Sequence, residues 1–245
     1  MRTLSSVDLL NAWEQGLGRG PAQRAMILLR LAAGAEDTAG DPARWPIGER
    51  DARLLDLRES AFGPQMEGVA SCPQCGLQQE FQMPAAALKV DAPARGGELV
   101  VASGEYHVEF RLPDSLDVCE IEAEAAVESE VSLRLLERCV TRAIAGERPV
   151  TAADLPDDIV REISERMSQA DPQAEIDVTL QCTGCSHRWS QPFDIASFLW
   201  TELHAWALRT LTEVHQLAAA YGWSETESLS LSPRRRGFYL EMIAG

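Results

Sequence analysis

The sequence predicts a mainly helical α+β protein in which a small zinc-ribbon-like antiparallel sheet is inserted between N- and C-terminal helices. Apolar residues recur at helical spacing before residue 66 and after residue 194. Between them, two segments alternate apolar and polar side chains with the period of two that is typical of strands. Two Cys-x-x-Cys motifs, Cys72–Cys75 and Cys182–Cys185, lie at these strand-like segments.

The N-terminal helical region covers residues 1–65 and is expected to contain three helices. Ser5 or its neighbour Ser6 can cap the first helix, which stops at a glycine-rich run. Pro21 suits the first turn of the second helix, and residues 47–61 form the third. We interpret the apolar stripes of these helices as core residues.

Residues 66–113 are expected to hold the first cysteine knuckle and a β-hairpin. Tyr106, Val108 and Phe110 alternate with polar residues, and the apolar run 99–101 precedes them across a short turn.

Residues 114–174 are predicted to be an inserted acidic helical region, with helix from 113 to about 146 and again from 156 to 169. Seven acids and no base lie between Asp114 and Glu130. Part of this charge favours a helix N-terminus; the rest is a solvated face or, alternatively, an acidic docking surface. Cys119 and Cys139 have no neighbouring Cys or His, and we interpret both as small core residues.

Residues 175–194 carry the second knuckle and a strand, and residues 195–245 a long helix and a helical tail. The long helix is expected to end at Gly222. A capping box at residues 224–227 and Ser232-Pro233 then start two short helices.

Charge and composition exclude several classes of protein. The 245 residues include 22 Lys plus Arg and 38 Asp plus Glu, which gives a net charge of −16 and disfavours a duplex-DNA-binding protein. No apolar run is long enough to span a membrane, and Asp8 interrupts the segment where a signal peptide needs apolar residues. We therefore expect a cytoplasmic protein whose six cysteines form no disulfide framework.

The paired Cys-x-x-Cys motifs predict one structural zinc site. Two facing knuckles supply four thiolates with the tetrahedral geometry that zinc prefers: Cys72, Cys75, Cys182 and Cys185. Residues 76–181 separate the pairs, whereas a simple ribbon has about 15–20 residues there. The longer loop costs roughly 1.5–2 kcal/mol of closure entropy. Structural zinc binding contributes about 10–16 kcal/mol, so the intervening segment is an insertion whose ends return to one place.

Two alternatives concern these cysteines. A thioredoxin-like redox role for the first pair leaves the second pair unexplained. His187 could replace Cys185 as a ligand, although four cysteines already complete the shell. A closed four-sulfur site has no open position for water or a substrate, which argues against metal catalysis.

The C-terminal tail is the candidate partner-binding segment. The alternative is a helical hairpin that packs apolar residues into the core, namely Trp223, Leu229, Leu231, Tyr239 and Leu240. Three adjacent arginines could pair with acids on another subunit or on the acidic helix of this chain. The candidate partner-binding residues are Trp223, Glu225, Arg234, Arg235, Arg236 and Tyr239.

Motifs spread over nearly the whole chain resemble the baseplate protein family of T4-like phages. Their order and spacing together carry the resemblance, and Thr183 in the second knuckle is a mild departure from the proline expected there. The motifs are Gly48-Glu49-Arg50-Asp51, Leu54-Leu55, Phe62-Gly63, Cys72–Gly76, Asp171–Ala174, Trp189, Phe193-Asp194, Phe198–Trp200, Val214–Ala218, Tyr221–Glu225, Leu231–Pro233, Arg235-Arg236 and Tyr239-Leu240.

The resemblance implies a non-enzymatic baseplate component, or a chaperone for assembly of the baseplate hub, of a contractile phage tail or a related injection system. Its partners would be baseplate or hub proteins, with no membrane and no small-molecule substrate. It would act in the cytoplasm or become part of a tail-like particle. The alternative function is a zinc-ribbon nucleic-acid-binding or transcription accessory protein, which the arginine cluster favours and the net charge opposes.

Overall fold

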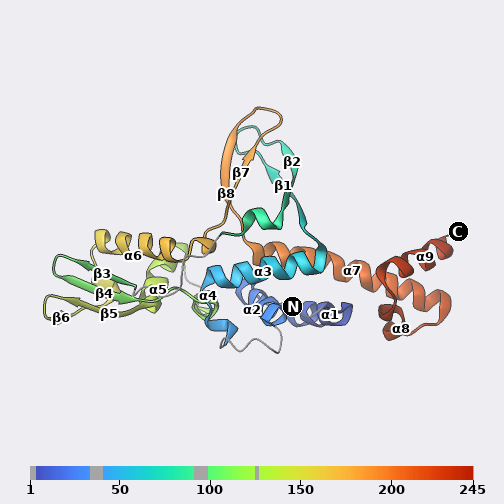
Figure 1. The fold of residues 1–245 in the computed structure, drawn as a ribbon, viewed down its shortest axis with the longest axis horizontal. Coiled ribbons are helices and arrows are strands. Elements are labelled where there is room, and N and C mark those ends of the chain that lie inside the picture. The colour runs from blue at the N-terminus through green and yellow to red at the C-terminus, as the bar shows by residue number, and fades with distance from the viewer. Residues whose placement is uncertain (1–3, 34–40, 91–98, 125–126, 245) are drawn as a thin grey trace.

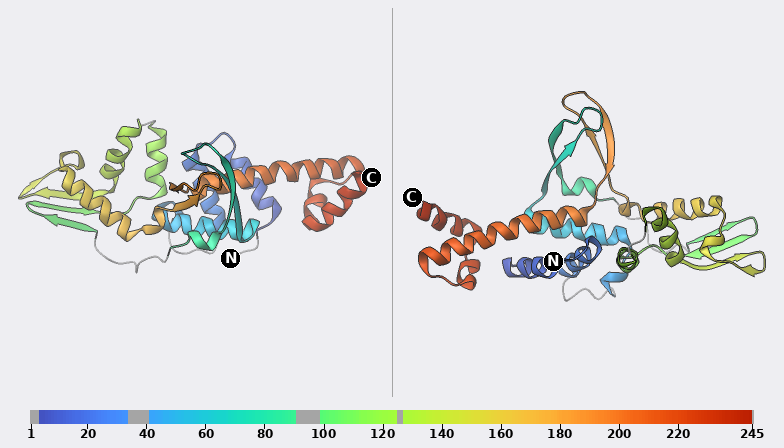
Figure 2. Two further views of the ribbon diagram at one scale, coloured as in Figure 1. Left: turned by 90° about the horizontal axis from the view of Figure 1, so that it is seen from above. Right: turned by 180° about the vertical axis from the view of Figure 1, so that it is seen from behind.

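The protein is elongated, with a helical body in the middle and three features that extend from it (Figure 1). The computed structural model describes residues 4–33, 41–90, 99–124 and 127–244. An arm of two β-hairpins projects from one side of the body, a lobe with a four-stranded sheet lies at one end, and two short helices lie at the other. Figure 2 shows that α7 continues beyond the body toward these two helices.

The helices and strands follow the order expected from the sequence at most positions. Nine α-helices are described: α1 (Ser6–Gly16), α2 (Pro21–Ala33), α3 (Ile47–Phe62), α4 (Ser115–Ala123), α5 (Glu128–Cys139), α6 (Asp157–Ala170), α7 (Ile195–Tyr221), α8 (Glu225–Ser230) and α9 (Pro233–Ala244). The strands are β1 (Gln65–Ser71), β2 (Gln78–Pro84), β3 (Val100–Ser103), β4 (Tyr106–Phe110), β5 (Val140–Ala145), β6 (Arg148–Pro149), β7 (Asp177–Gln181) and β8 (Arg188–Pro192). Short 3-10 helices are η1 (Pro42–Arg44), η2 (Ala85–Leu88), η3 (Ala152–Asp154) and η4 (Pro172–Ala174). Among the described residues, no helix is both long and apolar enough to cross a membrane. The mainly helical α+β fold with small antiparallel sheets is confirmed.

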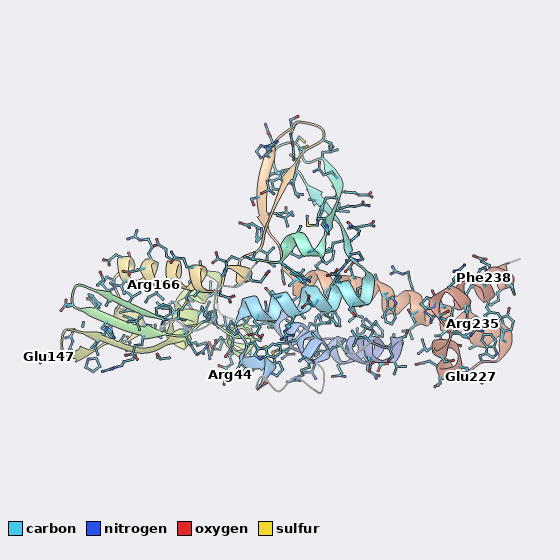
Figure 3. The ribbon with its side chains drawn as sticks, in the orientation of Figure 1. Arg44, Glu147, Arg166, Glu227, Arg235 and Phe238 are labelled. Carbon is cyan, nitrogen blue, oxygen red and sulfur yellow. The ribbon has the colours of Figure 1, made fainter. Side chains whose placement is uncertain are left out.

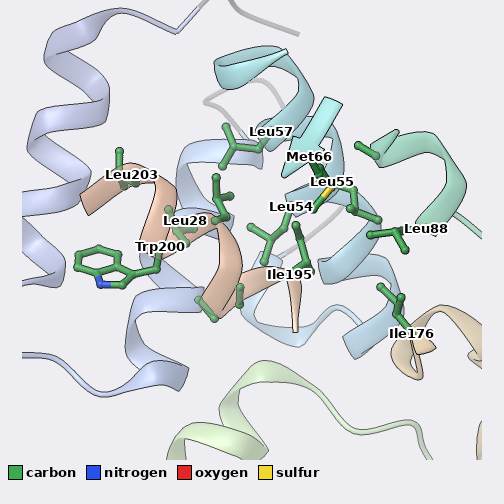
Figure 4. Close-up of a cluster of buried hydrophobic side chains, with 14 of the residues drawn as sticks. Leu28, Leu54, Leu55, Leu57, Met66, Leu88, Ile176, Ile195, Trp200 and Leu203 are labelled. Carbon is green, nitrogen blue, oxygen red and sulfur yellow. The ribbon is translucent and has the colours of Figure 1, made fainter. Parts of the chain in front are cut away.

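The main core lies where α1, α2, α3 and α7 meet (Figure 4). Leucines from three helices are fully buried there, including Leu28, Leu54 and Leu203. The first helix begins at the expected cap, because the Asp8 backbone N–H donates to the Ser5 hydroxyl. Gly16 at its other end is needed for close packing, since a Cβ atom there would overlap the Trp200 ring.

The arm consists of two separate antiparallel hairpins, β1–β2 and β7–β8. At its base, Met66 and Ile176 belong to the main core, which fixes the arm to the body. Farther out, Gly68 lies directly across the ladder from Phe81, and its lack of a side chain leaves room for that ring. The alternation predicted for β2 is present, because Phe81 and Met83 are partly buried against the main core whereas Glu80 and Gln82 are exposed.

The sheet lobe has the strand order β3-β4-β5-β6 and a core of its own. Val101, Val108 and Phe110 pack there against Ile159 and Ile163 of α6. The hairpin expected at residues 99–112 is confirmed, but it belongs to this sheet and not to that of the first knuckle.

The helix expected from 113 to about 146 is wrong beyond Cys139. Residues 140–145 form strand β5, which pairs with β4 through a register shift between Glu109 and Phe110. Helix-forming alanine and arginine in this segment give a mixed local signal, and pairing with an existing strand decides its conformation. The acidic segment is also divided into α4 and α5. Cys139 is buried as expected, whereas Cys119 is only partly buried.

The junction of body and lobe explains two of the sequence motifs. The Gly48 backbone N–H, at the start of α3, donates to the Asp171 carboxylate at 2.8 Å. Gln173 is buried and holds the main chain after η2, because its amide accepts from Val90 N and donates to Leu88 O. Residues 171–174 therefore hold two distant segments, the start of α3 and the chain around the end of η2.

Candidate metal centre

Each Cys-x-x-Cys motif forms the tip of one arm hairpin, and the two tips have the same backbone hydrogen bonds. In the first, Cys72 N donates to Leu77 O at 2.9 Å and Gly76 N donates to Cys72 O at 2.9 Å. In the second, Cys182 N donates to His187 O at 2.8 Å and Ser186 N donates to Cys182 O at 3.0 Å. The two knuckles are thus structural copies, each with two sulfur atoms at a hairpin turn.

The knuckles lie close to each other at the end of the arm. A Cβ atom on Gly184 would be 2.9 Å from Leu77 Cδ2, so glycine at this position lets the second tip approach the first. Gly184 lies between the two cysteines of its pair, and its backbone does not adopt a positive φ. Its role is close approach.

The four sulfur atoms form one cluster. Cys72 Sγ lies 3.7 Å from Cys185 Sγ, and Cys75 Sγ lies 3.6 Å from Cys182 Sγ. All four ligand atoms lie within 4.8 Å of one another. Four sulfurs at about 2.3 Å from a tetrahedral metal would be separated by about 3.8 Å. The chemistry and spacing of this cluster therefore fit a metal ion with four sulfur ligands.

The thiols ionise unequally. Backbone N–H groups of Cys185 and Gly184 lower the pKa of the Cys182 thiol to about 6, although burial opposes them. The His187 N–H acts to lower the pKa of Cys185, but burial and the neighbouring sulfurs outweigh it and raise this pKa to about 12. A cation at the centre would offset the repulsion between the four sulfurs and let all of them ionise.

Gln79 joins the two hairpins beside the cluster, which sequence reasoning missed. Its side-chain amide donates to Gln181 O at 2.9 Å and accepts from Thr183 N at 3.0 Å. The available signal was a glutamine at an otherwise apolar position of the alternating strand. A side chain with both a donor and an acceptor can hold two backbone segments at once.

A comparison with protein families gives one match. The family described as T4 bacteriophage base plate protein matches residues 31–200, more than half of the chain. The chain belongs to the T4 base plate protein family. Its matched residues include both knuckles, the whole sheet lobe and the motifs at Gly48 and Asp171. No curated protein and no solved structure gives a match.

Membership in the base plate family supports a structural role related to the phage base plate.

The candidate partner-binding tail lies outside the matched residues. Trp223 stacks on the exposed Tyr221 with ring centroids 4.8 Å apart, and Tyr239 meets both rings edge-on at 4.9 and 5.7 Å. Glu225 begins α8 and is exposed.

The three arginines of the tail do not form one surface. Arg234 and Arg235 are exposed, whereas Arg236 is buried and donates to Glu213 of α7 at 2.9 Å. Arg236 therefore does not pair with the acidic helix of this chain, which was one of the possibilities considered from the sequence. Instead, α9 is attached to α7.

The acidic segment 114–130 contains no basic residue, but arginines from outside it form ion pairs with its acids. Arg111 binds Asp117 with two hydrogen bonds of 2.7 Å. Arg138 of α5 binds Glu120 and Glu124, and the Ala22 N–H at the start of α2 donates to Glu122. Much of this charge thus holds the fold together.

Proposed function

We propose that this member of the base plate family is a non-enzymatic zinc protein of baseplate assembly in a contractile phage tail or a phage-tail-like injection system. It acts through protein–protein contacts with baseplate or hub proteins. The observation that carries the proposal is the family match, which spans both cysteine knuckles. We propose that the protein acts in the cytoplasm before it joins, or helps to build, the particle.

Zinc is the proposed metal because the donor set is four cysteine sulfurs at tetrahedral spacing. Cys72, Cys75, Cys182 and Cys185 would hold the ion and fasten the two hairpins of the arm. A closed shell of this kind offers no position for a substrate, so its contribution is folding free energy. The arm then presents a rigid surface to partners.

Metal analysis of protein expressed without added zinc tests this part of the proposal. We expect one zinc per chain in the wild type and strong loss of zinc in Cys72→Ser. Cys139→Ser is the matched control, because Cys139 is buried at the end of α5, is not part of the four-cysteine cluster and should leave the zinc content unchanged. A zinc content well below one per chain, or iron in its place, would overturn the assignment.

One experiment distinguishes two possible roles of the protein in baseplate assembly. A structural component stays in the finished particle, whereas a chaperone leaves after assembly. Mass spectrometry of purified particles and of the soluble fraction distinguishes them: stoichiometric presence in particles identifies a component, and presence only in the soluble fraction identifies a chaperone. Deletion should abolish particle assembly, and co-expression with hub proteins should give a complex. Normal particles after deletion, together with no complex, would contradict both roles.

The nucleic-acid alternative is disfavoured by the net charge of −16 and by the burial of Arg236.

A further inference from the structure

The C-terminal helix α9 has an inward face that is firmly attached to the molecule. Arg236 is 2% exposed and donates to Glu213 Oε2 and Leu231 O, both at 2.9 Å. Tyr239 makes edge-on contacts with Tyr221 and Trp223. These contacts fix the rotation of α9 about its axis, so its opposite face points away from the protein at one end of the long axis (Figure 3).

The outward face of α9 consists of Arg234, Gly237, Phe238 and Glu241, which follow the i, i+3, i+4, i+7 spacing of one helix side. Phe238 is 53% exposed, and Met242 beside it is 69% exposed. The side chains of Arg234 and Glu241 form no ion pair with the described part of the chain. A large aromatic side chain flanked by arginine is typical of the residues that dominate binding energy at interfaces.

The presence of glycine at position 237 is not explained by the contacts that the described part of the chain makes there. Gly237 lies inside α9 with ordinary helical φ, where glycine is less favourable than alanine. A Cβ atom there would meet nothing within 4 Å beyond its own helix and chain neighbours. No contact with the described part of the chain therefore requires glycine, whereas close approach of another helix would.

We propose that the outward face of α9 binds the same face of a second copy, with the two helices antiparallel. The two-fold axis passes between Gly237 and Phe238. Phe238 of each copy then lies over Gly237 of the other, and Arg234 of each faces Glu241 of the other. Such a two-fold contact is self-complementary, as an isologous interface must be.

Charge selects a second copy as the occupant. The face is positive at the N-terminal end of α9 and negative at the C-terminal end. An antiparallel copy satisfies both charges and also opposes the two helix dipoles favourably. One helix pair is a small interface, so the dimer should be weak and form at micromolar concentrations. The inference does not depend on the zinc site or on the baseplate role.

Sedimentation velocity of the full-length, metal-loaded chain over a range of micromolar concentrations tests the proposal. The wild type should be in a concentration-dependent monomer–dimer equilibrium. Phe238→Ala should weaken the dimer about tenfold or more. Leu208→Ala is the matched control, because Leu208 is an exposed apolar residue of α7 away from this face, and it should leave the equilibrium unchanged.

Two further variants identify the register. Arg234→Glu and Glu241→Arg should each weaken the dimer, and the double variant should restore it. Gly237→Ala should raise the thermal midpoint of the monomer, because alanine favours helix, and yet weaken the dimer. A wild type that stays monomeric, a dimer insensitive to Phe238→Ala, or a charge swap without rescue would overturn the proposal. So would a different protein that covers this face while the chain is monomeric.

Discussion

Gly76 and Ser186 occupy equivalent positions in the two knuckles, one residue after the second cysteine of each pair, and both have left-handed backbone. Their φ angles are +72° and +60°. Among the described residues, Ser186 is the one non-glycine residue with positive φ. For a residue with a side chain, the left-handed conformation costs about 1–2 kcal/mol of conformational free energy, a cost that glycine avoids. The first knuckle is therefore less strained than the second.

Replacing Ser186 by glycine should stabilise the protein. We expect Ser186→Gly to raise the free energy of unfolding by about 0.5–1 kcal/mol, because relief of the left-handed strain exceeds the added chain entropy of glycine. Denaturant unfolding of the metal-loaded protein measures the change. Gly76→Ser is the reciprocal control and should destabilise by a similar amount. Equal signs for the two variants would contradict the explanation.

Removing the Gln79 side chain should loosen the two arm hairpins. Gln79→Ala deletes two hydrogen bonds to the second hairpin, which should lower the free energy of unfolding by about 1–2 kcal/mol. Metal loss to a chelator should also be faster than in the wild type. Gln78→Ala is the control, because Gln78 is the exposed neighbour on β2. Equal chelation rates for the two variants would show that Gln79 does not support the site.

Asp171 should act at the junction through its oxygen atoms and not through its charge. Burial raises its pKa, although the Gly48 N–H bond opposes this, so the negative charge itself is not favoured there. Asp171→Ala should cost about 1–2 kcal/mol of stability by removing the acceptor for Gly48 N–H. Asp171→Asn keeps an oxygen acceptor and should retain most of the stability. Thermal unfolding of both variants separates the two effects.

The Arg111–Asp117 pair should make stability fall in acid. Burial acts to raise the pKa of Asp117, but Arg111 and the Asp114 N–H outweigh burial and lower this pKa below the ordinary 3.8. A carboxylate with a lowered folded-state pKa stabilises the protein above the unfolded-state value, and this contribution is lost as pH falls through the folded-state pKa. Asp117→Asn should therefore lower the free energy of unfolding at neutral pH by about 1–3 kcal/mol.

The same comparison in acid completes the test of this pair. The difference between wild type and Asp117→Asn should begin to shrink below about pH 4, where the carboxyl of the unfolded chain becomes protonated, and should disappear as pH falls through the lower folded-state pKa. Urea unfolding at several pH values measures it. Asp158→Asn, at an exposed position of α6, is the control with little effect at neutral pH. A difference that is independent of pH would show that the charge of Asp117 is not involved.

Arg236 should be required for the attachment of α9, unlike its neighbours. Arg236→Gln removes its bond to Glu213 in a buried setting and should cost about 2–3 kcal/mol. Arg235→Gln, at the exposed neighbouring position, should change stability by less than about 0.5 kcal/mol. Denaturant unfolding compares the two. Equal effects would mean that the burial of Arg236 does not matter.

Local signals predicted much of the fold. Caps, glycines and helical periodicity predicted α1, α3, α7 and the restart at Ser224, because these signals act within one or two turns. Strand β5 escaped prediction because its conformation depends on pairing with β4. The same holds for the acids of α4, whose arginine partners come from other segments.

Patterns in the sequence were sufficient to group the four cysteines, to predict helices at both ends of the chain and to recognise the resemblance to the base plate family. These follow from residue types at fixed spacing, which chemistry constrains directly. Three features became known only from the tertiary structure. The knuckles meet at the tip of an arm, and Gln79 bridges the two hairpins there. In the tail, Arg236 is buried while Arg234 is exposed. Contacts between residues distant in the chain depend on how its elements pack, and a linear spacing does not contain that information.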